Sequence, residues 1–228
     1  MDKGNTHVIL SSFLEGLQEA GAEVEVLYTK KLNIKPCEGC FNCWVKTPGV
    51  CIHKDDMPAI LPKIHSADIW VLATPLYVDG MTGPMKNMLD RIIPGALPFF
   101  EQRDGHNRHP GRHGTRGGKI VLVSNCGFWE MDNFDALVTH VEAISRNTGR
   151  KFAGALLRPH GGGLRTMKER GPILDDVLLA AKQAGQQLIK DGEIDRETLD
   201  RVSQQVMSQE DYTDIVNRGF KAQLEANQ

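Results

Sequence analysis

The sequence predicts a doubly wound α/β fold, in which a parallel sheet carries helices on both faces. Segments with helical and with strand periodicity alternate along the chain, and the strand segments are near-continuous apolar runs. Parallel neighbours need crossover connections, which helices supply, and such strands are buried on both faces. With 228 residues of ordinary composition, the chain is expected to form one domain, over residues 1–228, with a substantial core.

The expected elements follow one another in a regular order. Residues 6–21 carry apolar side chains at helical spacing and end at a glycine, whereas residues 23–28, EVEVLY, alternate and are β-branched as in a strand. The remaining expected helices are 55–67, 83–92 and 132–147, and the remaining expected strands are 68–74, 119–124 and 150–158. Helical patterns dominate from Pro172, so we expect a helical C-terminal extension over about 172–228.

Composition excludes several classes of protein. The formal net charge of -2 lacks the basic excess of a general nucleic-acid binder. Because no apolar run reaches the length of a membrane-spanning helix, we expect no membrane segment. The N-terminal residues lack the pattern of a secretory signal, so we expect a chain that stays in the reducing cytoplasm. Disulfides among the cysteines are not expected there.

Two loops are the expected place for a ligand. In open parallel sheets, ligands bind beyond the carboxyl ends of the strands, which here points to loops 75–82 and 124–131. Pro75 and Gly80 shape a turn in the first loop, and Tyr77 supplies an aromatic surface. No G-x-G-x-x-G follows an expected strand, so the dinucleotide fingerprint is missing. Taken alone, the letters PLYVDG fit a ligand loop and a purely structural turn equally well.

Four of the five cysteines lie close together, in the pattern C-x2-C-x2-C-x7-C. Short repeats of this kind let one loop wrap a compact inorganic core, as in ferredoxin-type [4Fe-4S] ligation. Structural zinc sites more often combine two C-x2-C knuckles from separate strands. A third interpretation is that the thiols hold no metal, or pack between subunits. The candidate metal ligands are Cys37, Cys40, Cys43 and Cys51, whereas Cys126 is expected to be a small packing residue.

Several of these motifs resemble one known family. The segments KPCEGCFNCW...CIHKDDM, SADIWVLATPLY and TPLYVDGMTGPMKNMLDR are similar to those of the NADPH-dependent FMN reductase family of flavodoxin-like proteins. The resemblance is strongest to its iron-sulfur flavoprotein branch, and it runs from Gly4 to about the end of the 150–158 strand. It implies FMN as cofactor, NAD(P)H as electron donor, and a homodimer or homotetramer. The residues that it implies around the flavin ring are Pro75, Leu76, Tyr77, Val78 and Gly80, with Ser124, Asn125 and Gly127 on the other edge.

The start of the chain departs from the family pattern. Relatives open with a β-strand and a loop ending in Gly-Asn-Thr, where helix N–H groups hold the FMN phosphate. Here Gly4, Asn5 and Thr6 match that loop, but the strand is absent from the sequence. The resemblance implies that Asn5 and Thr6 contact the phosphate, although they are equally suited merely to cap a helix. We expect a flavodoxin-like sheet lacking its first strand, from an upstream start codon or a truncated form, and weak FMN binding.

Residues 94–118 interrupt the alternation with a long insertion rich in arginine, histidine, glycine and proline. The insertion is expected either to be a lid over the flavin, with an arginine meeting the phosphates of NADPH or an acidic substrate, or to be solvated and partly disordered. The candidate arginines are Arg103, Arg108, Arg112 and Arg116. The later segment HGGGLRTM is expected to be a flexible turn, because no G-x-S-x-G exists to make it an esterase loop.

The preferred function is an FMN-dependent oxidoreductase that passes electrons from NAD(P)H to flavin, quinone or another small acceptor. The alternative is an iron-sulfur flavoprotein that exchanges electrons with a ferredoxin-like partner. A third interpretation is a scaffold that uses its thiols only for metal binding or assembly. No catalytic side chain is assigned, because the sequence shows no Ser-His-Asp arrangement or paired carboxylates in a recognisable motif.

Overall fold

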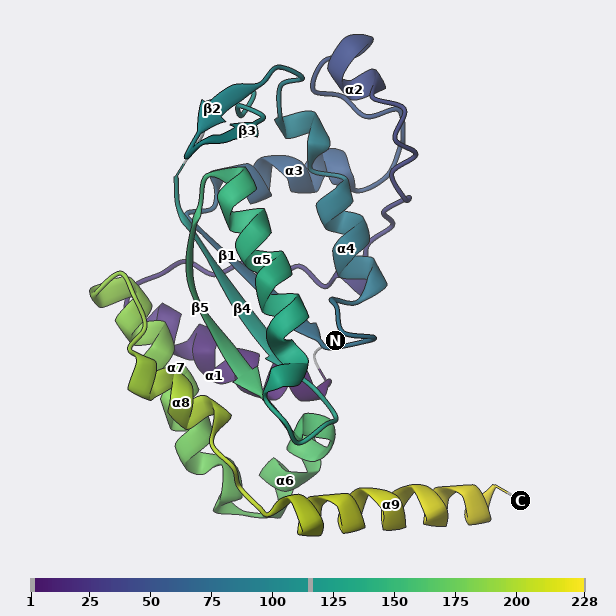
Figure 1. Ribbon diagram of the computed structural model, residues 1–228, viewed down its shortest axis with the longest axis vertical. Helices are drawn as coiled ribbons and strands as arrows, with labels where there is room; N and C mark the ends of the chain where they lie inside the picture. Colours follow the sequence, from purple (N-terminus) through teal and green to yellow (C-terminus); the bar gives the residue numbers. More distant parts are fainter. Residues whose placement is uncertain (1–2, 115–116, 228) are drawn as a thin grey trace.

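A parallel three-stranded sheet forms the middle layer of the computed structural model, which describes residues 3–114 and 117–227. Its strands are β1 (Ile69–Pro75), β4 (Lys119–Asn125) and β5 (Lys151–Arg158), in the order β1-β4-β5 (Figure 1). Helices cover both faces, which confirms the α/β class predicted from the alternating periodicities. All three strands match the segments predicted from their apolar runs to within a residue or two.

The register of the sheet places the three carboxyl ends side by side. Pro75 of β1 is opposite Asn125 of β4, which in turn is opposite Arg158 of β5. A register shift between Ile120 and Val121 interrupts the β4–β5 ladder, and Gly154 on the partner strand has a φ of 131° that favours glycine. The loops that follow β1, β4 and β5 therefore begin along one edge of the sheet.

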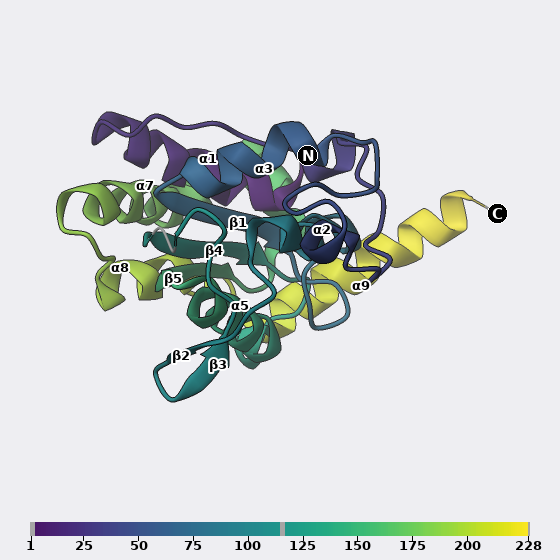
Figure 2. The ribbon, with the colours of Figure 1, turned by 90° about the horizontal axis from the view of Figure 1, so that it is seen from above.

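One face of the sheet is covered by α1 (Asn5–Glu19) and α7 (Asp175–Lys190). Val121 and Val123 of β4 are fully buried in this core. The two helices cross closely, because a Cβ on Gly16 would collide with a backbone oxygen of α7. Figure 2 shows α1 and α7 on one side of the strands and α5 on the other.

The other face is covered by α4 (Gly83–Asp90) and α5 (Asp135–Thr148), and side chains of α3 (Met57–Ser66) complete the same core. Ile120 and Leu122 of β4 point into it and are fully buried. Alternate residues of β4 thus serve two separate cores, as expected for a strand buried on both faces.

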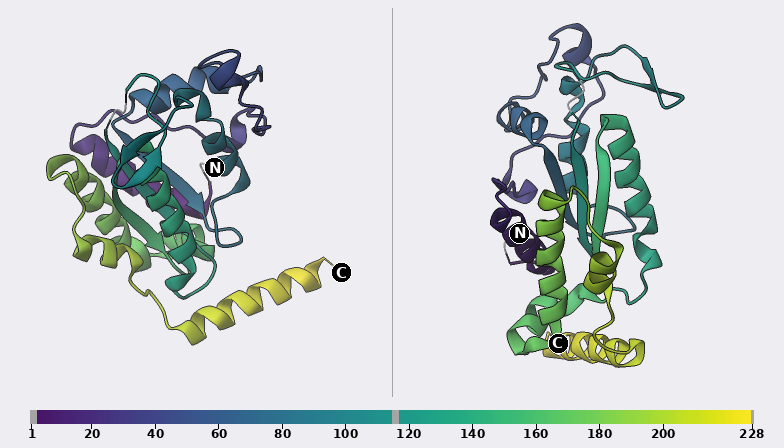
Figure 3. Two further views of the ribbon diagram at one scale, coloured as in Figure 1. Left: turned by 45° about the horizontal axis from the view of Figure 1, so that its top comes forward. Right: turned by 90° about the vertical axis from the view of Figure 1, so that its left-hand side faces the viewer.

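The remaining elements lie around these three layers. They are α2 (Asn42–Val45), β2 (Glu101–Arg103), β3 (His106–Arg108), α6 (Leu164–Arg170), α8 (Arg196–Ser203), α9 (Gln209–Ala226) and the 3-10 turns η1 (Thr29–Lys31), η2 (Ile93–Gly95), η3 (Asp132–Phe134), η4 (Gly161–Gly163) and η5 (Pro172–Leu174). Helix α8 packs against α7 and β5, whereas α9 extends away from the body of the molecule (Figures 1 and 3). Among the described residues, none of the helices has the length and apolarity needed to cross a bilayer.

The predicted strand at residues 23–28 is wrong. These residues form no helix or strand and connect α1 to η1. Within the described chain, β1 pairs with β4 alone. Residues 23–28 therefore form no strand pairing with the other edge of β1. Val24 and Leu27 are nevertheless packed against the two cores. The alternation does not match burial, because Val24 is half-buried whereas Val26 is 39% exposed.

The predicted flexible turn at HGGGLRTM is also wrong. The three glycines form the 3-10 turn η4, and α6 follows directly from Leu164. Leu164 is fully buried in the core beneath α1 and α7, which fixes the segment in place. His160, which precedes the glycines, adopts a left-handed conformation with a φ of 41°. Burial of one leucine thus orders a glycine-rich stretch that composition alone indicates to be mobile.

Candidate functional site

The turn after β1 presents apolar side chains at the carboxyl edge of the sheet. Its backbone is closed by two hydrogen bonds, from Tyr77 N–H to the Gly80 oxygen at 3.0 Å and from Gly80 N–H to the Tyr77 oxygen at 3.2 Å. Val78 and Asp79 both have positive φ, at 49° and 58°, and this conformation is unusual for a β-branched residue. Backbone strain of this kind clusters at ligand sites. Tyr77 is 65% exposed and Val78 is 98% exposed, so the turn holds two large apolar side chains in solvent.

The loop after β4 lies directly beside this turn, because Leu76 N–H donates to the Asn125 oxygen at 2.9 Å. Ser124 is 1% exposed, and its hydroxyl has no hydrogen-bond partner within the described part of the chain. A buried hydroxyl without a partner is energetically unfavourable, and it marks a donor that a ligand can satisfy. Further along the loop, the Gly127 oxygen accepts a hydrogen bond of 2.6 Å from the Tyr212 hydroxyl of α9.

The start of α1 reaches the same edge. The Thr6 hydroxyl donates to the Asn125 side-chain oxygen at 2.5 Å, and the Asn5 side-chain amide donates to the Gly162 oxygen at 2.7 Å. Gly4 occupies the N-cap position, and no side chain caps the helix there. Asn5 and Thr6 therefore do not act as caps, and they link α1 to the end of β4 and to the turn η4 that follows β5.

The structure thus gathers the predicted flavin-site residues along one edge of the sheet. Three separate segments meet there, namely the turn after β1, the loop after β4 and the start of α1. The residues concerned are Asn5, Thr6, Pro75, Leu76, Tyr77, Val78, Gly80, Ser124, Asn125 and Gly127. Their convergence is what a ligand spanning the ends of adjacent parallel strands requires.

The four clustered cysteines occupy a different part of the molecule. All are free thiols that line one surface cavity of about 20 Å³, where Cys43 is buried, Cys51 is half-buried, and Cys37 and Cys40 are exposed. Burial raises the pKa of the Cys43 thiol, and the three neighbouring thiols raise it further. In the described ranges, no group of three or more His, Cys, Asp or Glu side chains is arranged to hold a metal ion. The thiols therefore share a cavity without forming a tight site for a single ion.

The insertion packs on the cysteine loop. Residues 101–108 form the β2–β3 hairpin, and the His109 ring lies 4.8 Å from the ring of Trp44. Arg112 donates to the backbone oxygens of Pro94 at 3.0 Å and Cys43 at 3.4 Å. This arrangement differs from the expected lid over the flavin loops. Much of the insertion is exposed, including Phe99 and Phe100 at 69% each, which agrees with the expected solvated segment.

The candidate arginines of the insertion differ in the groups that they contact. Arg103 pairs with Glu101 at 3.2 Å and donates to the Asn147 oxygen at the end of α5 at 2.9 Å. Arg108 donates to the backbone oxygen of the neighbouring Asn107 at 3.3 Å. Arg116 lies outside the described residues. Arg103 therefore has a structural role, because it links the β2–β3 hairpin to the end of α5.

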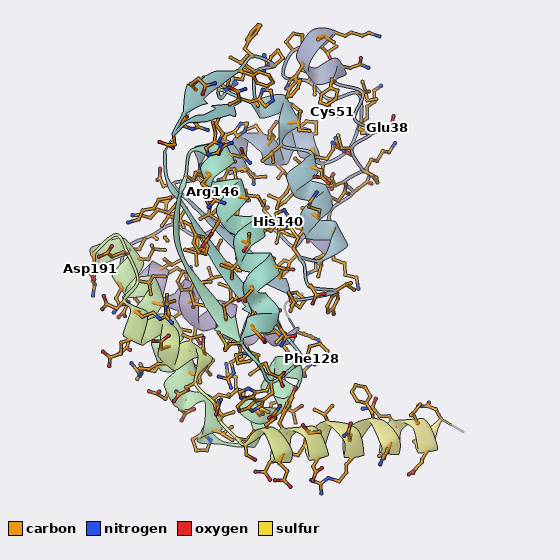
Figure 4. All side chains as sticks on the ribbon, viewed as in Figure 1. Glu38, Cys51, Phe128, His140, Arg146 and Asp191 are labelled. Atoms are coloured by element: carbon orange, nitrogen blue, oxygen red, sulfur yellow. The ribbon has the colours of Figure 1, made fainter. Side chains whose placement is uncertain are left out.

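Helix α4 separates the two candidate sites. It begins at Gly83, just after the exposed turn, and the next residue after its end, Arg91, contacts the cysteine loop. An eight-residue helix is about 12 Å long, since each residue adds about 1.5 Å. Figure 4 shows Cys51 and Phe128, which follows Gly127, far apart along the long axis of the molecule. The chain therefore carries two distinct candidate centres.

Sequence reasoning missed a buried ion pair beside the cysteines. Arg91 and Asp55 are joined at 2.6 Å, with side chains only 1% and 0% exposed. A signal was present, because Arg91 continues the helical spacing of the buried Met85 and Met88. A charge on the buried face of an amphipathic helix indicates a buried partner.

Sequence reasoning also missed a basic cluster at the end of β5. Arg158 is fully buried and donates to backbone oxygens of Val202 at 3.1 Å and Gln204 at 2.5 Å, and to the His160 ring nitrogen Nε2 at 2.5 Å. Burial lowers the pKa of Arg158 to about 10. Burial, aided by the Arg158 charge, lowers the pKa of His160 to about 4. The signal was a charged residue closing the apolar strand segment RKFAGALLR.

Relatives of known name are similar to part of the chain. An iron-sulfur flavoprotein of Archaeoglobus fulgidus is 31% identical over 124 residues, which are 54% of this chain and 50% of that protein. An iron-sulfur flavoprotein of Methanosarcina thermophila is 28% identical over 179 residues, covering 76% of this chain and 88% of that protein. The chain spans about half the length of several of the curated relatives that it matches.

Solved structures share the fold at low sequence identity. An FMN-dependent NADH-azoreductase from Bacillus anthracis, in complex with FMN, has a TM-score of 0.59 at 15% identity over 83% of this chain and 94% of that one. An NAD(P)H:quinone oxidoreductase from Methanothermobacter marburgensis has a TM-score of 0.53 at 19% identity over 82% and 92% of the two chains. The model of the NADPH-dependent FMN reductase family matches residues 1–121, just over half of the sequence. This match confirms the resemblance drawn from the motifs, and the chain belongs to the NADPH-dependent FMN reductase family.

Proposed function

We propose that the chain is an FMN-dependent oxidoreductase that takes electrons from NAD(P)H and passes them to flavin, a quinone or another small acceptor. The observation that carries the proposal is the unpartnered buried hydroxyl of Ser124, which lies near the carboxyl end of β4, opposite Thr74 of β1. When bound, a flavin accepts a hydride and releases electrons singly or in pairs. The family assignment supports this choice of cofactor.

The residues at the edge of the sheet have separate roles in this proposal. The N-terminus of α1 offers backbone N–H groups and the positive end of the helix dipole to a phosphate, with Asn5 and Thr6 beside it. Tyr77 and Val78 supply the apolar contact for the ring, and Ser124 donates a hydrogen bond to it. The protein contributes binding and orientation, and no side chain is assigned as acid or base.

Replacing Ser124 tests the cofactor site. We expect Ser124→Ala to weaken FMN binding about fivefold, because about 1 kcal/mol of hydrogen bonding is lost. The same change is expected to leave the cofactor-free chain at least as stable, because it removes a buried hydroxyl without a partner. Flavin fluorescence titration and urea unfolding measure the two effects.

Ser145 provides a matched control. It is equally buried, at 1% exposed, but its hydroxyl donates to the Val141 oxygen at 2.9 Å within α5. We expect Ser145→Ala to leave FMN affinity unchanged. Equal FMN affinities for wild type and Ser124→Ala would remove Ser124 from the site. A wild-type chain that takes up no FMN at saturating concentration would defeat the proposed function itself.

The outer edge of β1 provides a second test. A strand of about seven residues, fused ahead of Gly4 and long enough to pair along β1, is expected to tighten FMN binding at least about tenfold, or about 1.4 kcal/mol. The physical reason is that the added ladder would hold the turn at Tyr77 and the start of α1 in a fixed relation. A glycine-serine extension of equal length is the control, and equal affinities for both forms would contradict the idea.

Turnover assays distinguish the oxidoreductase from the alternative. We expect the FMN-loaded chain to oxidise NADH or NADPH when free FMN or a quinone is supplied, which is followed by nicotinamide absorbance. An electron carrier would show negligible turnover until a ferredoxin-like protein was added. Comparison of NADH with NADPH in the same assay defines the preferred donor.

A second candidate function, iron-sulfur electron transfer, is favoured by the four free thiols around one cavity. We propose that Cys37, Cys40, Cys43 and Cys51 hold a [4Fe-4S] cluster, which would relay single electrons. The compact repeat of closely spaced cysteines fits cluster ligation. The enclosed space is little larger than a water molecule, so the exposed thiols of Cys37 and Cys40 would form the solvent side of such a site.

Assembly into a homodimer or homotetramer completes the proposal. Ile215, Phe220 and Leu224 of α9 are 49%, 63% and 66% exposed, and a helix of 18 residues is marginally stable by itself in water. We expect Phe220→Glu with Leu224→Glu to shift the sedimentation mass of the chain to that of a monomer. A mass unchanged by this pair of substitutions would place the subunit contact elsewhere.

A further inference from the structure

The cysteine loop is tied down at both of its ends by one arginine. Arg91 Nη1 donates to the Asp55 carboxylate at 2.6 Å, and Nη2 donates to the same carboxylate at 3.2 Å. Nη1 also donates to the backbone oxygen of Lys35 at 2.5 Å. Lys35 precedes the first thiol of the loop and Asp55 follows the last. The guanidinium therefore joins the entry and the exit of the loop to the end of α4.

Asp55 strengthens the same junction. Its carboxylate accepts the Lys35 N–H at 3.0 Å and the Met57 N–H, at the start of α3, at 3.2 Å. Burial alone would raise the pKa of Asp55, but the hydrogen bonds from Arg91 and from these two backbone groups hold it below its ordinary value. The carboxylate is thus charged at neutral pH and bridges the loop, α3 and α4.

One donor of Arg91 is not used by this junction. The Nε–H group is buried and has no partner among the residues that the structure describes. Burial alone would lower the pKa of Arg91, but Asp55 and the thiol of Cys51 raise it above its ordinary value, so Cys51 lies within electrostatic reach.

Stability alone is a weak explanation for this ion pair. Buried ion pairs are often no better for stability than well-packed apolar residues of similar size, whereas they do fix a unique arrangement in some proteins. Here the arrangement that is fixed is the position of four thiols around a cavity. Lys86 and Asp90 of the same helix form a contrasting pair, which is exposed and lies away from these contacts.

We propose that Arg91 is a positioning residue for the four-thiol loop: it clamps the entry of the loop at Lys35 to its exit at Asp55 and joins both to the end of α4. The inference rests on the proposed function, because it assigns Arg91 a role toward a cluster bound by these thiols. Groups that hold metal ligands in position typically change metal affinity about 10–100-fold when they are removed. Removal of the clamp is therefore expected to speed the release of iron.

The test compares three variants of the full chain. Arg91→Met combined with Asp55→Leu replaces the ion pair by apolar side chains and is expected to preserve folding. Arg91→Lys keeps the charge but loses the forked geometry. Lys86→Met removes a cation from the same helix and is the control. Circular dichroism and FMN titration confirm that each variant is folded.

Two readouts separate the clamp from the cluster. In reconstituted protein, we expect the double variant to release iron about 10–100-fold faster than wild type, and Arg91→Lys to be intermediate. In iron-free protein, we expect a thiol reagent to modify Cys43 much faster in the double variant than in wild type, where Cys43 is buried. Lys86→Met should match wild type in both readouts.

The outcomes distinguish the two proposals. If wild type takes up no iron while the double variant still exposes Cys43, the cluster fails and the clamp stands. If wild type holds iron and the double variant matches it both in iron release and in Cys43 reactivity, the role of Arg91 is overturned. A faster Cys43 reaction in Lys86→Met would overturn it as well, because the effect would then be general to α4.

Discussion

Lowering the pH from 6.5 to about 4 is expected to reduce the free energy of unfolding by about 3 kcal/mol through His160, because each pKa unit is worth about 1.4 kcal/mol. The folded chain holds the pKa of His160 at about 4, whereas the unfolded chain restores it to 6.5. Over that window the unfolded state binds the additional proton. The contribution is therefore complete above pH 6.5 and is lost as the pH falls to about 4.

The physical reason is the surroundings of the ring. His160 is fully buried, and its Nε2 accepts a hydrogen bond from Arg158, so protonation would place a second positive charge beside the first without water to screen it. Urea unfolding at a series of pH values measures the effect. We expect His160→Gln to flatten the profile, and His106→Gln, at an exposed position, to leave it unchanged. A profile for His160→Gln as steep as that of wild type would contradict the assignment.

Removing the buried thiol of the cysteine loop is expected to abolish iron binding. Cys43 is the deepest of the four, and a cluster that lacks one of its four ligands is not retained. We expect Cys43→Ala to show near-complete loss of iron and acid-labile sulfide after anaerobic reconstitution. The matched control is Cys126→Ala, because Cys126 is equally inaccessible but lies at the other candidate site, where its thiol contacts the Phe128 oxygen.

The iron contents of Cys43→Ala and Cys126→Ala decide between the interpretations of the thiols. Cys126→Ala is expected to keep the iron content of wild type, and iron retained by Cys43→Ala would exclude the four-thiol site. Stoichiometric zinc in place of iron would instead support the zinc interpretation. Because the pKa of Cys43 is raised, metal uptake must displace a proton from it, so uptake should be faster at higher pH.

The layers of the fold could be predicted because each buried strand is a continuous apolar run. Ile120 and Leu122 face one core while Val121 and Val123 face the other, so the sequence 119–124 has no polar side and is recognisable as a central strand. Residues 23–28 are the counterexample, because a strand is predicted there and none forms. Their alternation is typical of a strand with one buried side, but Val26 is 39% exposed. Strand formation also requires a backbone partner, and the outer edge of β1 has no strand beside it in the described chain.

The candidate sites could be predicted from the sequence only in part. Sequence spacing was sufficient to group the four thiols, and the fold class was sufficient to select the loops after two strands. Arg91 and Asp55 are 36 positions apart, and their pairing depends on how α4 packs against the loop, which no local pattern records. The same holds for the insertion, because the contact between Trp44 and His109 is a tertiary one.

The hydrogen bond from Tyr212 to the Gly127 oxygen links the C-terminal segment to the proposed cofactor site. Tyr212 is only 6% exposed, and it anchors the first turns of α9 to the very backbone that is proposed to border the flavin. A protease cut or a premature stop codon ahead of this tyrosine would release that carbonyl and loosen the loop behind it. Loss of the C-terminal segment would then be measured as faster dissociation of the flavin from a site that is built of residues far earlier in the sequence.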